Sequence, residues 1–316
     1  MPKILISEKI DPICPQLFRE AGFQLDHQPG LTPEELGAVI GEYEGLVVRS
    51  STKVTADLIA KAAKLKVVGR AGAGVDTIDV PAATAAKILV MNTPGQNAAG
   101  VAELVIGLML ALVRHVVIGC TTLKGGLWEK NRLSGTEIGG KTLGLIGFGA
   151  VGRKVAALAR GFGMTVLAHD PLLNDSQITA GGAKPASIAD ILAGADFVSL
   201  HLPKTKETAN LINAETLAKM KKGAILINCA RGGLVDEAAL AAALKSGHLA
   251  GAAFDVFAAE PPAADNPLLA LDNFIATPHL GASTAESQVN VAVAVARQMI
   301  AYFQSGALEG AVNSVS

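Results

Sequence analysis

Short apolar runs alternate with amphipathic segments along most of the chain. In its first third the apolar runs predict strands at residues 3–7, 45–49, 66–69 and 88–91. Helical patterns fill two of the intervals, at 32–43 and 55–63. Strands that alternate with helices are typical of βαβ units, so this pattern predicts a doubly wound parallel sheet.

A second series of the same kind begins after a loop-like segment at 124–140 that is rich in glycine and charge. Its predicted strands cover 142–147, 165–169, 197–201, 224–228, 251–256 and 274–277, and its helices cover 151–161, 188–193, 214–220 and 237–246. A last helix is expected at 284–305, because Ser and Thr residues lie at its start and Gly306 follows its end. At roughly 150 residues per domain, a chain of 316 residues suggests two such α/β domains.

Composition narrows the class of protein. Hydrophobic residues make up 50% of the chain but aromatics only 4%, which suits parallel sheets covered by helices. The net charge of -1, without a basic tail, argues against a nucleic-acid partner. The three cysteines have no CxxC spacing, so we expect neither a disulfide framework nor a metal site. A reducing compartment fits this, and since no signal peptide is apparent we expect a cytoplasmic protein.

The most apolar stretch, residues 101–120, contains Glu103, Arg114 and His115. Its uncharged part, 104–113, is ten residues long, whereas a membrane span needs about 20. We therefore expect one long helix that is buried or lies at an interface, and no membrane partner.

A glycine fingerprint joins the predicted strand at 142–147 to the helix at 151–161. Gly147 permits the tight turn, Gly149 lets a pyrophosphate approach the backbone, and Gly152 lets the helix pack closely on the strand. A pyrophosphate there would meet backbone N–H groups at the positive end of the helix, around Ala150 and Val151. The motif in this context predicts a dinucleotide cofactor.

Asp170 ends the next predicted strand, 18 residues after Gly152. This interval is close to the roughly 20 residues expected for the acid that binds the ribose hydroxyls. The carboxylate would repel a 2′-phosphate, so the sequence predicts NAD rather than NADP.

Longer motifs carry a resemblance to a known family. They are Asn-Cys-Ala-Arg-Gly-Gly at 228–233, Phe-Asp-Val-Phe-Ala-Ala-Glu-Pro-Pro at 254–262, Pro-His-Leu-Gly-Ala-Ser at 278–283, and the segments 48–54, 68–76 and 91–94. Together they resemble the D-isomer-specific 2-hydroxy acid dehydrogenases along nearly the whole chain. The resemblance implies a flavodoxin-like substrate domain (1–97 and 283–316) and a Rossmann NAD domain (98–282). It also implies a homodimer or dimer of dimers, in which the helix over 101–120 forms much of an interface.

The resemblance also implies catalytic roles. His279 would be the acid/base, and Glu260 would hold its tautomer and raise its pKa. Arg231 would bind the substrate carboxylate, and Asp255 would position the nicotinamide. Taken alone, each could be an ordinary loop or surface residue. Their common place near strand ends argues for function, since ligands bind at that edge of open α/β sheets.

Further cofactor contacts follow from the resemblance. They are Ala73, Leu202, Cys229, Ala230, Gly281 and Ala282, together with Arg231, Asp255 and His279. Backbone N–H groups of Gly72, Ala73 and Gly74 would cradle the substrate carboxylate.

The substrate is less constrained. Within the family the closest resemblance is to members that oxidise 3-phosphoglycerate in serine synthesis, and it places Arg49, Ser50, Arg70 and a partner's Lys130 near a second anionic group. The chain ends at Ser316, so we expect no C-terminal regulatory domain. Hydroxypyruvate, glyoxylate, lactate and sulfolactate remain alternative substrates. An NAD-sensing corepressor-like scaffold is another alternative, and the carboxylate at position 260 argues against a formate dehydrogenase.

Overall fold

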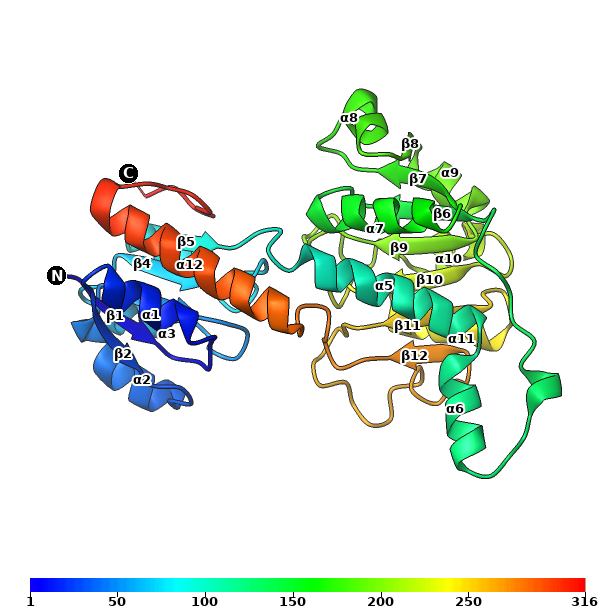
Figure 1. Ribbon diagram of the computed structural model, residues 1–316, viewed down its shortest axis with the longest axis horizontal. Coiled ribbons are helices and arrows are strands. Elements are labelled where there is room, and N and C mark those ends of the chain that lie inside the picture. Colours follow the sequence, from blue (N-terminus) through cyan, green and yellow to red (C-terminus); the bar gives the residue numbers. More distant parts are fainter. Residues whose placement is uncertain (316) are drawn as a thin grey trace. The chain divides into compact units, whose positions relative to one another are not determined.

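Residues 1–315 are described in the computed structural model, and they form two compact units. The first unit combines Met1–Asn97 with the chain from Thr284 onward, and the second is Ala98–Ser283 (Figure 1). The first unit has strands β1 (Lys3–Ile6), β2 (Gln24–His27), β3 (Gly45–Val48), β4 (Val67–Arg70) and β5 (Leu89–Asn92). Its helices are α1 (Ile13–Glu20), α2 (Pro33–Val39), α3 (Ala56–Lys61), α4 (Val80–Ala85) and α12 (Ala285–Ser305), with a 3-10 turn η1 (Ile40–Glu42).

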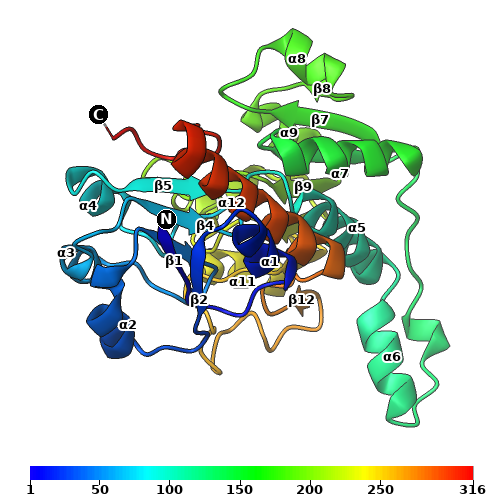
Figure 2. The same cartoon turned by 60° about the vertical axis from the view of Figure 1, so that its left-hand side comes forward.

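The first sheet is parallel throughout, in the order β2-β1-β3-β4-β5. Alternation along β1 directs Ile4 and Ile6 to the cluster under α1 and α12, whereas Leu5 joins the cluster under α2, α3 and α4. Helices α1 and α12 lie side by side on one face of the sheet (Figure 2). The strand order reverses between β1 and β3, which is where flavodoxin-like sheets bind ligands.

The second unit has a larger sheet. Its strands are β6 (Thr142–Ile146), β7 (Thr165–His169), β8 (Lys184–Pro185), β9 (Phe197–Leu200), β10 (Ile225–Asn228), β11 (Gly251–Phe254) and β12 (Phe274–Ala276). Its helices are α5 (Ala98–Val113), α6 (Val116–Lys124), α7 (Ala150–Gly161), α8 (Asp175–Ala180), α9 (Ile188–Gly194), α10 (Ala214–Lys219) and α11 (Glu237–Lys245), with a 3-10 turn η2 (Lys130–Arg132).

All pairings in this sheet are also parallel, in the order β12-β11-β10-β9-β6-β7-β8. Helices α5 and α7 cover one face, where Leu143 and Leu145 are fully buried, and α9, α10 and α11 cover the other (Figure 1). The order reverses between β6 and β9, as in Rossmann folds. The predicted fold class, two doubly wound parallel sheets, is confirmed.

The prediction of one helix over 101–120 is wrong. Helix α5 ends at Val113, His115 adopts a left-handed conformation with φ 53°, and α6 then starts at Val116. The two helices meet at 63°. Among the described residues, no single helix has the length and apolar character to cross a membrane, although this bent pair passes that test jointly. Helix α5 buries much of its surface in the second unit, whereas α6 has no buried residue.

Candidate active site

Five loops of the second unit begin at one edge of its sheet. The register pairs Ile146 with Leu200, Leu200 with Asn228, Asn228 with Phe254, and Phe254 with Ala276. These are the last residues of β6, β9, β10, β11 and β12. The fingerprint and the segments that carry Arg231, Asp255 and His279 therefore start side by side, where α/β sheets bind ligands.

His279 and Glu260 form a hydrogen-bonded pair. Nδ1 of the imidazole lies 2.8 Å from Oε2 of Glu260. The other carboxylate oxygen accepts the backbone N–H of Phe257 at 3.0 Å, which fixes the carboxylate to its own loop. The His279 side chain is 51% exposed and its backbone is left-handed, with φ 55°. Because Nδ1 is engaged, proton exchange with a bound ligand falls to Nε2.

Asp255 organises the loop that carries His279. Its side chain is buried, and it accepts hydrogen bonds from the Thr277 hydroxyl at 2.6 Å, Leu280 N–H at 2.7 Å and Gly281 N–H at 2.8 Å. Both carboxylate oxygens are thus used to hold the segment on either side of His279. Thr277 was not singled out by the sequence; its place directly after β12 is the only signal there for it.

A buried asparagine shapes the turn that carries Arg231. Asn228 donates its amide to the Arg231 carbonyl at 2.9 Å and accepts the Ala230 N–H at 3.1 Å. The Arg231 guanidinium donates to the Ala230 carbonyl at 2.7 Å. A Cβ at Gly232 would overlap the Phe257 carbonyl, so this turn packs directly against the loop of Glu260. Asn228 is a site residue that the sequence reasoning missed.

The fingerprint glycines have separate reasons to be glycine. Gly147 has φ 98°, and a Cβ there would overlap the His201 carbonyl. At Gly152 a Cβ would lie 2.5 Å from the Gly147 carbonyl, whereas at Gly149 it would meet nothing within 4 Å. The open space lies at the N-terminus of α7, where no side chain caps the helix and where Ala150 and Val151 form the first turn. This arrangement fits a pyrophosphate group.

Asp170 is joined to the same turn. One of its oxygens accepts the Phe148 N–H at 2.8 Å, and the other accepts the Leu172 N–H at 3.0 Å. The carboxylate is therefore held at the end of β7, beside the strand that leads into the fingerprint.

Two nearby groups are held in uncharged form. Burial lowers the pKa of His201, next to Leu202, to about 4, and its Nε2 lies 3.0 Å from the Ser199 hydroxyl. Burial, reinforced by the charge of Asp255, raises the pKa of the Cys229 thiol well above its ordinary range. A thiolate nucleophile is therefore disfavoured at this position.

The first unit presents a second set of predicted residues. After β4, Gly72 adopts φ 151° and its carbonyl accepts the Thr93 N–H at 3.0 Å. The Asn92 amide donates to the Ala73 carbonyl at 2.6 Å, and the Arg70 guanidinium donates to the Ala71 carbonyl at 2.6 Å. These bonds fix the shape of the loop that continues to Gly74.

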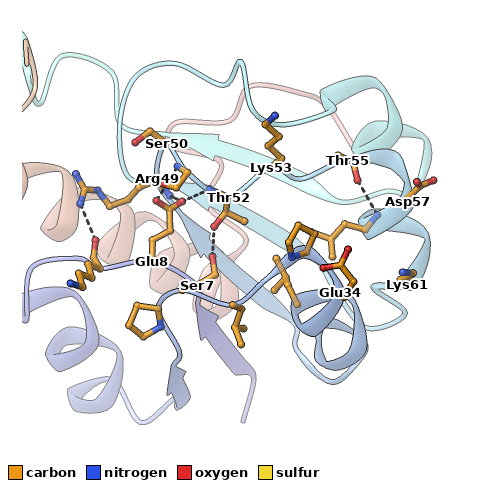
Figure 3. Close-up of a pocket in the computed structure, with 18 residues that line it drawn as sticks. Ser7, Glu8, Glu34, Arg49, Ser50, Thr52, Lys53, Thr55, Asp57 and Lys61 are labelled. Carbon is orange, nitrogen blue, oxygen red and sulfur yellow. Dashed lines mark hydrogen bonds between the residues drawn. The ribbon is translucent and has the colours of Figure 1, made fainter. Parts of the chain in front are cut away.

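Arg49 and Ser50, after β3, line a cavity of about 840 Å³ in the first unit (Figure 3). Arg70 and the loop 72–74 are not among the residues that line it. Lys130 lies in the other unit, exposed at the start of η2.

Comparison with known proteins agrees with this geometry. The family model "D-isomer specific 2-hydroxyacid dehydrogenase, NAD binding domain" matches residues 106–281. D-3-phosphoglycerate dehydrogenase of Rattus norvegicus is 44% identical over 99% of this chain, but the match covers 58% of the rat protein, so this chain spans little more than half of that relative.

Two solved structures are similar over nearly their full lengths. One is an NAD⁺-bound 3-phosphoglycerate dehydrogenase of Entamoeba histolytica, with 32% identity and a TM-score of 0.84 over 100% of this chain and 99% of that one. The other is a glyoxylate reductase from Paecilomyes thermophila, with 30% identity and a TM-score of 0.90 over 98% of both chains. The chain belongs to the D-isomer specific 2-hydroxyacid dehydrogenase family.

Proposed function

We propose that this protein is an NAD-dependent dehydrogenase that oxidises 3-phosphoglycerate to 3-phosphohydroxypyruvate, a step of serine synthesis. The observation that carries the chemistry is the His279–Glu260 pair, 2.8 Å apart, at the carboxyl edge of the second sheet. The identity to D-3-phosphoglycerate dehydrogenases, such as the rat enzyme at 44%, supports the substrate.

Each catalytic residue has one task in this proposal. When bound, NAD supplies the hydride acceptor. His279 takes the hydroxyl proton of the substrate on Nε2, and Glu260 keeps the other ring nitrogen engaged. Arg231 binds the substrate carboxylate through its planar guanidinium. Asp255 holds the His279 loop and, in this proposal, also orders the nicotinamide end of the site together with Gly281 and Ala282.

We assign cofactor binding to the second unit. Its fingerprint leaves space above Gly149 at an uncapped helix N-terminus, which fits the pyrophosphate. Asp170 accepts the ribose hydroxyls and repels a 2′-phosphate, so NAD is preferred over NADP. Leu202, Cys229 and Ala230 complete the contacts from the ends of β9 and β10.

We assign further substrate contacts to the first unit. Backbone N–H groups of Gly72, Ala73 and Gly74 receive the substrate carboxylate. The side chains of Arg49, Ser50 and Arg70, with Lys130 of a second copy, receive the phosphate, because fixed cations favour a second anionic group on the substrate.

We further propose a homodimer formed through the α6 region. Helix α6 has no buried residue and exposes Val116 (55%) and Leu123 (56%), and Trp128, which follows the helix, is 80% exposed. Apolar side chains grouped this way on a helix are typical of a surface that a partner covers. We also propose that the protein is located in the cytoplasm. Its cysteines Cys14, Cys120 and Cys229 are all free, which fits a reducing compartment.

A glyoxylate or hydroxypyruvate reductase is the second candidate, because the glyoxylate reductase has a TM-score of 0.90 to this chain. A substrate panel decides between the two. We would compare kcat/KM for 3-phosphoglycerate, glycerate, lactate and sulfolactate with NAD, and for hydroxypyruvate and glyoxylate with NADH. A clear lead for 3-phosphoglycerate supports the proposal, whereas a lead for an unphosphorylated acid overturns the substrate assignment. Binding of NAD without turnover of any acid would indicate a sensor.

A further inference from the structure

The turn after β3 is built around a carboxylate from another strand. Glu8, two residues after β1, accepts backbone N–H groups from Arg49 at 2.7 Å, Thr52 at 2.9 Å and Ser51 at 3.1 Å. The Ser7 and Thr52 hydroxyls, 3.0 Å apart, join the same two segments (Figure 3). Successive N–H groups that converge in this way form an anion-binding concavity, and here the chain fills it with its own carboxylate.

Glu8 carries its negative charge in this position. Burial alone would raise its pKa, but the N–H groups of Thr52, Arg49 and Ser51 lower it by more, so the pKa lies below its ordinary value. At neutral pH the anion-binding concavity is therefore occupied by a charged carboxylate, and its hydrogen bonds are of the strong, charge-assisted kind.

The segment at 8–9 fixes Arg49 at both ends. Glu8 holds its backbone N–H, and the Lys9 carbonyl accepts its guanidinium at 2.9 Å. Arg49 and Ser50 both line the cavity beside the point where the strand order reverses. Lys9, Lys53 and Lys61 also line this cavity, so a shift of the turn would move one of its four cations relative to a bound ligand.

We propose that Glu8 is a positioning residue that sets the preference of this enzyme for a substrate with a second anionic group. It acts through Arg49, whose N–H it accepts, and through Ser50, which lies between the N–H groups of Arg49 and Ser51 that it accepts. This inference rests on the function proposed above, and it adds a residue of the same cavity whose carboxylate is engaged by the turn that carries Arg49 and Ser50.

The chain supplies a matched control. Glu44 precedes β3, and its carboxylate accepts the Lys3 N–H at 2.7 Å. It therefore joins the same two strands as Glu8, but at the opposite edge of the sheet, away from Arg49 and Ser50. Glu44→Gln therefore measures the effect of losing a carboxylate that ties β1 to β3 away from the cavity, although Glu44 accepts one backbone N–H and Glu8 accepts three.

The experiment compares wild type, Glu8→Gln, Glu8→Asp and Glu44→Gln. With NADH, kcat and KM are measured for 3-phosphohydroxypyruvate and for hydroxypyruvate. In Glu8→Gln we expect the KM for the phosphorylated acid to rise about tenfold, as for one weakened hydrogen bond to a charged group. Its kcat and the KM for hydroxypyruvate should stay within about twofold of wild type. Glu8→Asp keeps the charge and should recover part of the preference, while Glu44→Gln should preserve it.

The outcomes distinguish a failure of the proposed function from a failure of the role assigned to Glu8. If wild type shows no preference for the phosphorylated acid, the proposed function fails, and with it the role of Glu8. If wild type shows the preference and Glu8→Gln keeps it, or Glu44→Gln loses as much, the inference alone is overturned. Should Glu8→Gln fail to fold, the ratio of the two KM values in Glu8→Asp, compared with wild type and Glu44→Gln, gives the same decision.

Discussion

His279 has one ring nitrogen committed to the protein and one left for chemistry. Nδ1 lies 2.8 Å from the Glu260 carboxylate, which in turn accepts the Phe257 N–H. These two hydrogen bonds fix the imidazole. Such an arrangement is what an acid/base needs, because proton transfer is effective only in a defined geometry.

Replacing His279 should therefore affect turnover and not cofactor affinity. We expect His279→Ala to lower kcat by about 10² or more, the usual contribution of a positioned acid/base, with NAD affinity nearly unchanged. Steady-state kinetics and an NAD fluorescence titration measure the two quantities. His248→Ala is the control, since His248 Nε2 lies against the Leu217 carbonyl. A loss of only a few fold would refute the role of His279.

His201 should make stability depend on pH. Its folded pKa of about 4 lies below the ordinary 6.5, so the unfolded chain binds more protons between these values. Stability contributed by the neutral ring is thus present above pH 6.5 and is lost as pH falls towards 4. Between pH 7 and pH 4.5 the free energy of unfolding should therefore fall by about 2 to 3 kcal/mol less in His201→Asn than in wild type. Urea unfolding at pH 7 and pH 4.5 tests it, and equal losses in variant and wild type would contradict it.

At this scale the sequence predicted what lies at the ends of strands. Arg231, Glu260 and His279 belong to recognisable segments that follow β10, β11 and β12. It did not predict Glu8 or Asn228, because their partners are backbone groups of turns. The residue types of a turn do not determine its shape or the direction of its N–H groups.

Among the elements, the loops after β10 and β11 depend on one another. The turn at 228–233 can approach the Glu260 loop only because Gly232 has no side chain. The position of Glu260, and through it that of His279, is therefore sensitive to a neighbouring element.

Gly232→Ala tests this dependence. A methyl group there overlaps the Phe257 carbonyl, so the backbone must move. We expect a loss of roughly 1–3 kcal/mol in stability, as for overpacked cores, together with a fall in kcat. Gly161→Ala, at the end of α7, meets nothing within 4 Å and should be neutral or stabilising. The idea would be wrong if thermal melting and kcat were unchanged in Gly232→Ala.

Elements were predicted well where burial produces a pattern and poorly where it does not. The last helix has the predicted Thr284 cap and the left-handed Gly306. Strand β2 was missed because Gln24–His27 is an edge strand with no fully buried residue. The break at His115 was missed because it has neither proline nor glycine, and apolar composition continues beyond it.

For the whole molecule, the break after α5 separates a core helix from an exposed one. Helix α5 packs in the hydrophobic core of the second unit, whereas α6 exposes Val117 (49%) and Leu123 (56%) on the surface. A helix with no buried residue gains little from its own chain, because most helix stability in proteins comes from packing.

The proposed dimer follows from this surface. Val117→Glu combined with Leu123→Glu should shift the protein from dimer to monomer in sedimentation velocity, because burying unpaired charge is costly. The matched control is Leu158→Glu combined with Phe162→Glu, at exposed apolar positions in and after α7. A monomeric wild type, or a variant that stays dimeric, would reject this interface.

The route of the chain also has a consequence during its synthesis. Helix α12 buries Val291, Val295 and Met299 against the first sheet, yet the whole second unit is translated before it. At ~5–20 residues translated per second, the apolar face of β4 stays uncovered for roughly ten to forty seconds before α12 is synthesised. The second unit, continuous in sequence, can complete its fold within that interval. The apolar face that α12 covers thus stays exposed for longer during synthesis than the core of the second unit.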